Sequence, residues 1–143
     1  MFGSRSNPAN AYSRVGLETS VQGASPYQLI VLLFEGARQA VVIARAGVDA
    51  GDIAQKGTAI TKAIDIILNG LRASLDLEAG GNLAQNLYAL YDYMARRLLH
   101  ANINNDGAAL DEVLGLLNEI HSAWIAIGQQ LEADDTESRR VGG

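Results

Sequence analysis

From Pro26 to its end the chain contains no further proline, and apolar residues recur along it at spacings of three and four. This spacing places apolar side chains on one face of a helix, and without proline nothing has to interrupt that helix. Breaks rich in Gly, Asn and Asp fall at 51–52, 80–81 and 104–107. Helices joined by such short connections pack as antiparallel neighbours. We therefore predict an all-α, up-down four-helix bundle.

Each predicted helix begins after a residue whose side chain can accept a hydrogen bond from the first backbone N–H groups. In chain order these capping residues are Ser25, Asp52, Asn82 and Asp106. A glutamine follows the first three of them at the third position, which is the spacing of a capping box. Pro26 suits the first position of its helix, and Gly80–Gly81 should end the second helix.

The first predicted helix, over residues 25–49, carries an unusually wide apolar arc, on the order of 200° where a surface helix shows about 100°. Two interpretations fit this arc. The helix is either buried deeply in its own bundle or faces a second partner. Val31 breaks the polar side of the same helix near Glu35 and Arg38, which would make it a contact residue if it is exposed.

These patterns divide the chain into three parts. Residues 1–24 are rich in Ser, Asn, Gly and Ala without helical periodicity, so we predict a flexible N-terminal arm. Residues 25–132 form the bundle. Residues 133–143 are polar, and we predict a frayed, disordered tail.

Composition excludes several classes of function. The net charge of −5 argues against nucleic-acid binding, which needs a dense basic surface. No segment has the roughly 18 apolar residues that membrane insertion requires, and the N-terminus lacks a signal-peptide core. The chain has no cysteine, so it forms no disulfide and uses no thiolate. We expect a cytoplasmic protein without metal or cofactor.

The search for catalytic groups yields one candidate, His100. Arg96 and Arg97 precede it and could attract a phosphorylated partner, so a phosphotransfer bundle acting through His100 is one alternative. His100 also lies in the last turn of its helix, where a cation interacts well with the helix dipole. We predict that the protein is not an enzyme and that it acts by binding.

The helix predicted over residues 82–106 is the richest source of binding residues. It carries two apolar stripes, of which the second contains Tyr88 and Tyr91. These rings either fill the bundle core with their hydroxyls at its edge or line a groove that receives an apolar helix. Tyr12 is a lone aromatic residue in the arm, where Val15 follows it, and such a residue is expected to dock in a groove.

Several short strings resemble the FliS family of flagellar export chaperones. They include Ala24-Ser25-Pro26, Leu33-Phe34-Glu35-Gly36-Ala37 and Asn69-Gly70-Leu71. The most specific is Leu90-Tyr91-Asp92-Tyr93-Met94 followed by Arg96-Arg97-Leu98. The similarity covers about residues 10 to 128.

The resemblance implies a cytoplasmic chaperone that binds the C-terminal segment of unpolymerised flagellin, prevents premature polymerisation and delivers flagellin to the export gate protein FlhA. It also raises a flagellin regulator such as FliW as a further partner, and it implies that Tyr12 and Val15 dock at the gate or cover a groove. We expect dimers or arm docking in the free protein, because exposed apolar surface favours self-association. A generic helical adaptor is the remaining alternative. The residues that we predict to form the flagellin-binding groove are Val31, Phe34, Arg38, Leu87, Tyr88, Tyr91, Ala95 and Leu99.

Overall fold

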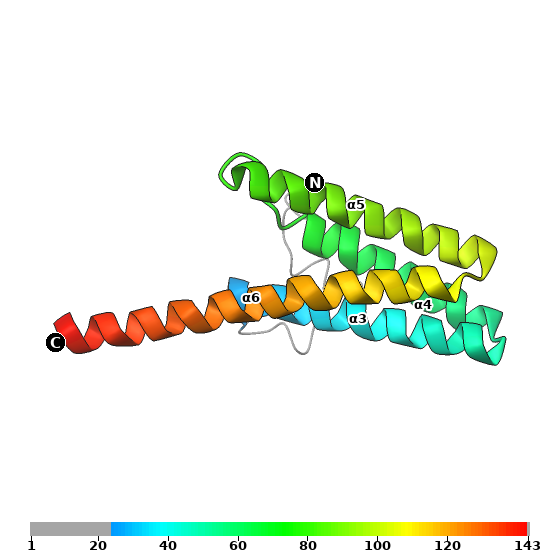
Figure 1. Ribbon diagram of the computed structural model, residues 1–143, viewed down its shortest axis with the longest axis horizontal. Helices are drawn as coiled ribbons and strands as arrows, with labels where there is room; N and C mark the ends of the chain where they lie inside the picture. Colours follow the sequence, from blue (N-terminus) through cyan, green and yellow to red (C-terminus); the bar gives the residue numbers. More distant parts are fainter. Residues whose placement is uncertain (1–23, 143) are drawn as a thin grey trace.

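The computed structural model describes residues 24–142 as helices that run alternately up and down (Figure 1). The helices in chain order are α3 (Pro26–Ala50), α4 (Ile53–Asp65), the π-helix η2 (Ile66–Arg72), α5 (Gly81–Asn104) and α6 (Gly107–Gly142). No strand occurs in this part of the chain. Because η2 continues α4 directly, residues 24–142 form an antiparallel bundle of four helical segments, which confirms the predicted fold class.

The predicted caps at three of the four helix starts are present. Ser25 Oγ accepts the Gln28 N–H at 3.2 Å, and Gln28 Oε1 accepts the Ser25 N–H at 3.0 Å, which completes a capping box. Asp52 accepts from the backbone N–H at the third position of α4, at 3.0 Å, and Asp106 does the same for α6, at 3.3 Å. These bonds satisfy backbone donors that have no partner inside the helix.

The boundary between α4 and α5 differs from the prediction. The second helix widens into η2, ends at Arg72 and is followed by a turn, instead of continuing to Gly80–Gly81. Ser74 Oγ donates to the Leu71 carbonyl at 2.7 Å, and Asp76 Oδ1 accepts two backbone N–H groups at 3.0 and 3.1 Å. These local bonds compete with the helix and end it early. The α5 helix then begins after Gly80 with no side-chain cap, so the predicted capping box at Asn82 does not form.

The C-terminal segment also differs. Residues 133–142 belong to α6, whereas the sequence predicted a disordered tail over 133–143. No proline and no glycine interrupts the chain between Gly128 and Gly142, so the i to i−4 hydrogen bonds can propagate along it. Gln130 and Asp134, one turn apart, add a side-chain hydrogen bond of 3.0 Å.

The wide apolar arc of α3 is explained by its central position. It packs against α4, η2 and α6, and its buried residues fill the core. Those residues are Leu33, Phe34, Gly36, Ala37, Ala40, Val41, Ala44 and Gly47. Deep burial of α3 within its own bundle, the first of the two interpretations, therefore explains the apolar residues of the arc that are buried.

Candidate binding cleft between the helix pairs

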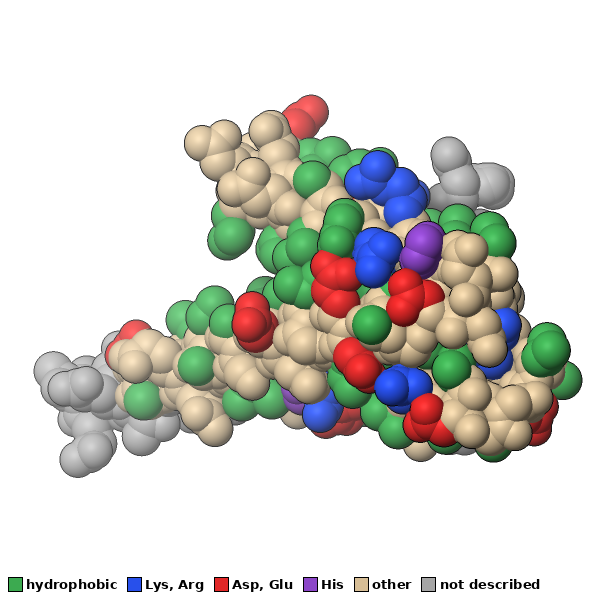
Figure 2. Space-filling model, turned by 45° about the vertical axis from the view of Figure 1, so that its right-hand side comes forward, with side chains coloured by type: hydrophobic (Ala, Val, Ile, Leu, Met, Phe, Trp, Pro, Cys, Tyr) green, Lys and Arg blue, Asp and Glu red, His purple; other side chains and the backbone are tan. Residues whose placement is uncertain are grey.

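An apolar cleft opens where α5 and α6 separate. The two helices lie close near their connecting turn and diverge toward the start of α5 (Figure 1). The cleft there has a volume of about 430 Å³. Figure 2 shows the notch between the start of α5 and α6 with hydrophobic side chains on its walls. The lining residues are Ile30, Phe34, Leu71, Ser74, Leu75, Asp76, Ala79, Gly80, Leu83, Ala84, Leu87, Tyr91, Ile120 and Trp124.

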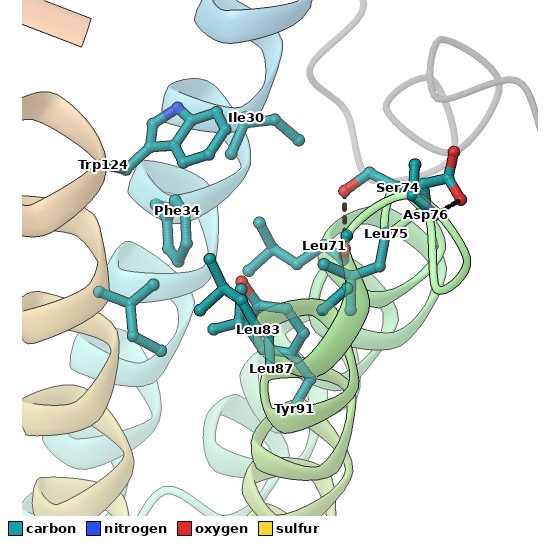
Figure 3. A pocket seen from close by; sticks show the side chains of 14 residues that line it. Ile30, Phe34, Leu71, Ser74, Leu75, Asp76, Leu83, Leu87, Tyr91 and Trp124 are labelled. Atoms are coloured by element: carbon teal, nitrogen blue, oxygen red, sulfur yellow. Dashed lines mark hydrogen bonds between the residues drawn. The ribbon is translucent and has the colours of Figure 1, made fainter. Parts of the chain in front are cut away.

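The cleft has a buried floor and an exposed rim. Phe34 and Leu71 are each 1% exposed and form part of the floor, which they share with the bundle core. Leu83 stands at the rim and is 68% exposed. Figure 3 shows Trp124 and Phe34 on one side and Leu83 and Leu87 on the other. The arrangement suits the capture of a few apolar side chains, because it offers them contact on several sides.

Tyr27 fixes the position of Trp124 in the cleft wall. The two rings stack with centroids 5.6 Å apart, and Trp124 Nε1 donates to the Tyr27 carbonyl at 3.4 Å. Tyr27 Oη in turn donates to the Ile125 carbonyl at 3.4 Å. The ring lies directly on Gly128, where a Cβ atom would collide with it. These contacts tie the start of α3 to α6 and hold that wall of the cleft in place.

Charged residues on the outer surface of α5 link this helix to its neighbours. Arg72 of η2 lies 4.8 Å from the centroid of the Tyr88 ring and 3.4 Å from Asp92. On the other side, Arg97 pairs with Glu112 of α6 at 2.8 Å, and Tyr93 Oη donates to the same carboxylate. The bonds from Tyr93 and Arg97 lower the pKa of Glu112. Exposed pairs such as these contribute little stability, so their main effect is to orient α5.

His121 of α6 is a buried histidine next to Phe34, which lines the cleft. Its ring centroid lies 5.8 Å from that of Phe34, and its Nδ1 lies 3.5 Å from Arg38 Nη1. A guanidinium can only donate, so Nδ1 accepts and the proton resides on Nε2. Nε2 is buried without a hydrogen-bond partner among the described residues. Burial, and then the charge of Arg38, lowers the pKa of His121, whereas Glu35 acts in the opposite direction.

This histidine should make the fold sensitive to mild acid. Because the native state disfavours the imidazolium, the unfolded chain binds a proton first as pH falls. The stability contribution is therefore complete above the unfolded-state pKa, near 6.5, and is lost as pH drops below it toward the native pKa. We expect the urea midpoint to fall between about pH 7.5 and pH 5.5, and His121→Leu to remove most of that fall.

His100→Gln is the matched control, because it removes the exposed histidine and should leave the pH-dependent fall intact. An unchanged midpoint of the original chain over this range would contradict the assignment to His121. Carboxylates with lowered pKa values, such as Asp106 and Glu112, affect stability only at still lower pH.

His100 lies exposed at the end of α5 with both ring nitrogens engaged. Nε2 is 3.1 Å from Asp106 Oδ2, and Nδ1 is 3.1 Å from Asn104 Nδ2. Asp106 also accepts the backbone N–H of Ala109, which is the main reason for its lowered pKa. His100 therefore joins the cap between α5 and α6, as expected for a histidine at a helix end.

Among the side chains that the structure describes, those of residues 24–131, 133 and 134, no group of three or more His, Cys, Asp or Glu is arranged to hold a metal ion. In the same part of the chain, no helix combines the length and the apolar character needed to cross a membrane.

A protein-family model described as flagellar protein FliS matches residues 8–131. This chain belongs to the FliS family. The flagellar secretion chaperone FliS of Salmonella typhimurium is 53% identical over 129 residues, which cover 90% of this chain and 94% of the relative. That of Escherichia coli is 47% identical over 114 residues, 80% and 84% of the two chains. That of Bacillus subtilis is 31% identical over 137 residues, 96% of each.

The structure of this FliS-family chain separates the eight residues predicted to form one groove. Phe34, Leu87 and Tyr91 line the cleft together. Arg38 lies in a different depression between α3 and α6, where its side chain donates to Asn118. The remaining four do not line the cleft: Val31 is half-buried, Ala95 is buried, Tyr88 packs under Arg72, and Leu99 is 51% exposed. Tyr12 and Val15 lie outside the described residues.

Sequence reasoning missed the α6 wall and the rim. Ile120, Trp124 and Leu83 all line the cleft, yet in the sequence they belong to regular apolar stripes with spacings of three and four. A stripe has the same spacing whether it faces the core or a cleft, so periodicity alone could not separate them. Trp124 was the available signal, because tryptophan is enriched at interfaces.

Proposed function

We propose that this chain is a cytoplasmic export chaperone that binds the C-terminal segment of unpolymerised flagellin, prevents its premature polymerisation and delivers it to the type III export gate. The observation that carries the proposal is the open apolar cleft with its exposed leucine rim. Its relatives, named flagellar secretion chaperones, support an export role. The chain then acts by binding, without turnover and without a cofactor.

The energetics of the cleft fit such a partner. A segment that becomes ordered only on contact gives up roughly 2–5 kcal/mol in ordering. Burial of apolar surface, at about 25 cal/mol per Å², is the term that can offset this cost. A cleft that leaves Leu83, Leu87 and Trp124 partly in contact with water in the free protein provides that surface.

Delivery to the export gate would use a different part of the chain. We infer that Tyr12 and Val15 take part in docking to the cytoplasmic domain of FlhA, and the family match, which begins at residue 8, includes both positions. A flagellin regulator such as FliW and a second copy of the free chain are further proposed partners. They would compete for apolar surface that flagellin covers.

The proposed function is tested by mixing the chain with flagellin and with flagellin that lacks its C-terminal few dozen residues. We expect a one-to-one complex with the first and none with the second, measured by size-exclusion chromatography and calorimetry. His100→Gln should bind like the original chain. Equal binding of the truncated flagellin, or phosphate transfer that His100→Gln abolishes, would overturn the proposal.

A further inference from the structure

Tyr91 places a polar atom in a cleft that is otherwise apolar. The side chain is 3% exposed, and its hydroxyl points from α5 into the cleft toward Phe34 (Figure 3). Tyr27 and Tyr93 donate their hydroxyls to partners within the chain, but Tyr91 Oη bonds no described residue. A docked ligand that covers this hydroxyl would have to supply a hydrogen-bond partner for it, so the atom is available to one that the cleft admits.

The other polar side chains of the cleft are already engaged. Ser74 donates to the Leu71 carbonyl, Asp76 accepts backbone N–H groups of its own turn, and Trp124 donates to Tyr27. Burial raises the pKa of Tyr91, so its hydroxyl keeps its proton and can both donate and accept. Apart from the second carboxylate oxygen of the exposed Asp76, the Tyr91 hydroxyl is therefore the side-chain hydrogen-bonding group that the cleft leaves to a ligand.

The walls also restrict the backbone of the ligand. They are the sides of helices and one turn. Apart from the uncapped first turn of α5, the backbone groups of these helices are bonded within their own helices, so the cleft presents no strand edge. An extended segment would bury unpaired N–H and C=O groups there, at a high cost in free energy. An α-helix satisfies its own backbone and inserts only the side chains of one face.

We propose that the Tyr91 hydroxyl is a specificity-determining group, which hydrogen-bonds one amide or hydroxyl side chain on the otherwise apolar face of a helix in the partner. The assignment rests on the proposed function, in which that helix belongs to the C-terminal segment of flagellin. A cleft that hydrogen-bonds its ligand discriminates against a helix with only apolar residues on this face, because the hydroxyl would then be buried without a partner.

Tyr91→Phe tests the assignment, since it removes one oxygen and keeps the ring. We expect flagellin affinity to fall about tenfold, as for the loss of one buried hydrogen bond, with an unchanged or higher urea midpoint for the free chain. Tyr93→Phe is the matched control on the same helix. It removes the bond to Glu112 outside the cleft and should leave affinity unchanged. Calorimetric titration with flagellin measures both variants.

A double-mutant cycle locates the partner atom. Single alanine substitutions at the polar positions of the flagellin segment are titrated against the original chain and against Tyr91→Phe. One substitution should weaken binding to the original chain about tenfold and have no further effect on Tyr91→Phe. Equal affinity of the original chain and Tyr91→Phe would overturn this assignment alone. A failure of the original chain to bind flagellin would overturn the proposed function together with it.

Discussion

Leu83→Asp is expected to weaken binding of the flagellin C-terminal segment about hundredfold and to leave the fold intact. Leu83 is 68% exposed at the rim of the cleft, so the free chain can hydrate an aspartate there. The docked helix would cover that position, and both the lost apolar burial and the dehydration of an unpaired carboxylate oppose binding. Together they amount to roughly 3 kcal/mol, which is about a hundredfold in affinity.

Leu99→Asp is the matched control for this prediction. Leu99 is 51% exposed on the same helix, but it does not line the cleft. The substitution has the same chemistry and similar exposure, so flagellin affinity should stay close to that of the original chain. Calorimetric titration measures both, with circular dichroism to confirm that each variant is helical. If Leu99→Asp loses as much affinity as Leu83→Asp, the binding surface extends beyond the cleft, as the sequence-based list of groove residues would have it.

The fold was predictable because most of its determinants are local. Ser25, Asp52 and Asp106 cap helices through side chains that reach only two or three residues along the chain, so the sequence shows them directly. The end of the second helix was not predictable in this way. Ser74 and Asp76 end the helix through local hydrogen bonds, several residues before Gly80 and Gly81, which are also helix-ending residues. The sequence does not show which of these two stop signals is the stronger.

The π-helix η2 was missed for a related reason. Its buried residues Ile66, Ile67, Gly70 and Leu71 keep the spacing of an ordinary amphipathic helix, although the backbone bonding has changed.

The cleft exists because α5 diverges from α6. This divergence is set by how the helices pack in three dimensions, and not by a local sequence pattern. Tyr91 is buried like a core residue and also lines the cleft, so the two sequence interpretations of this ring do not exclude each other.

Gly70→Val is expected to reduce the free energy of unfolding by about 3 kcal/mol. A Cβ atom at position 70 would lie 2.8 Å from Leu33 Cδ2 and 3.0 Å from Leu33 Cδ1. Leu33 is fully buried, so it has no free space to move into, and overpacking of this kind typically costs 1–3 kcal/mol. Valine adds two further carbons and a restricted χ1 angle, which places it at the upper end of that range. Urea denaturation followed by circular dichroism measures the change.

Gly115→Ala separates this packing effect from the general effect of glycine in a helix. Gly115 is exposed on α6, and a Cβ atom there meets nothing within 4 Å. Its replacement should stabilise the chain by up to about 1 kcal/mol, because alanine loses less backbone entropy on folding.

A double mutant tests the contact with Leu33. Leu33→Ala should reduce the free energy of unfolding less in the Gly70→Val background than alone, since the smaller residue makes room for valine. If the losses of stability from the two single substitutions simply add in the double mutant, η2 moves away from α3 to admit valine. Gly70 then does not set the distance between η2 and α3.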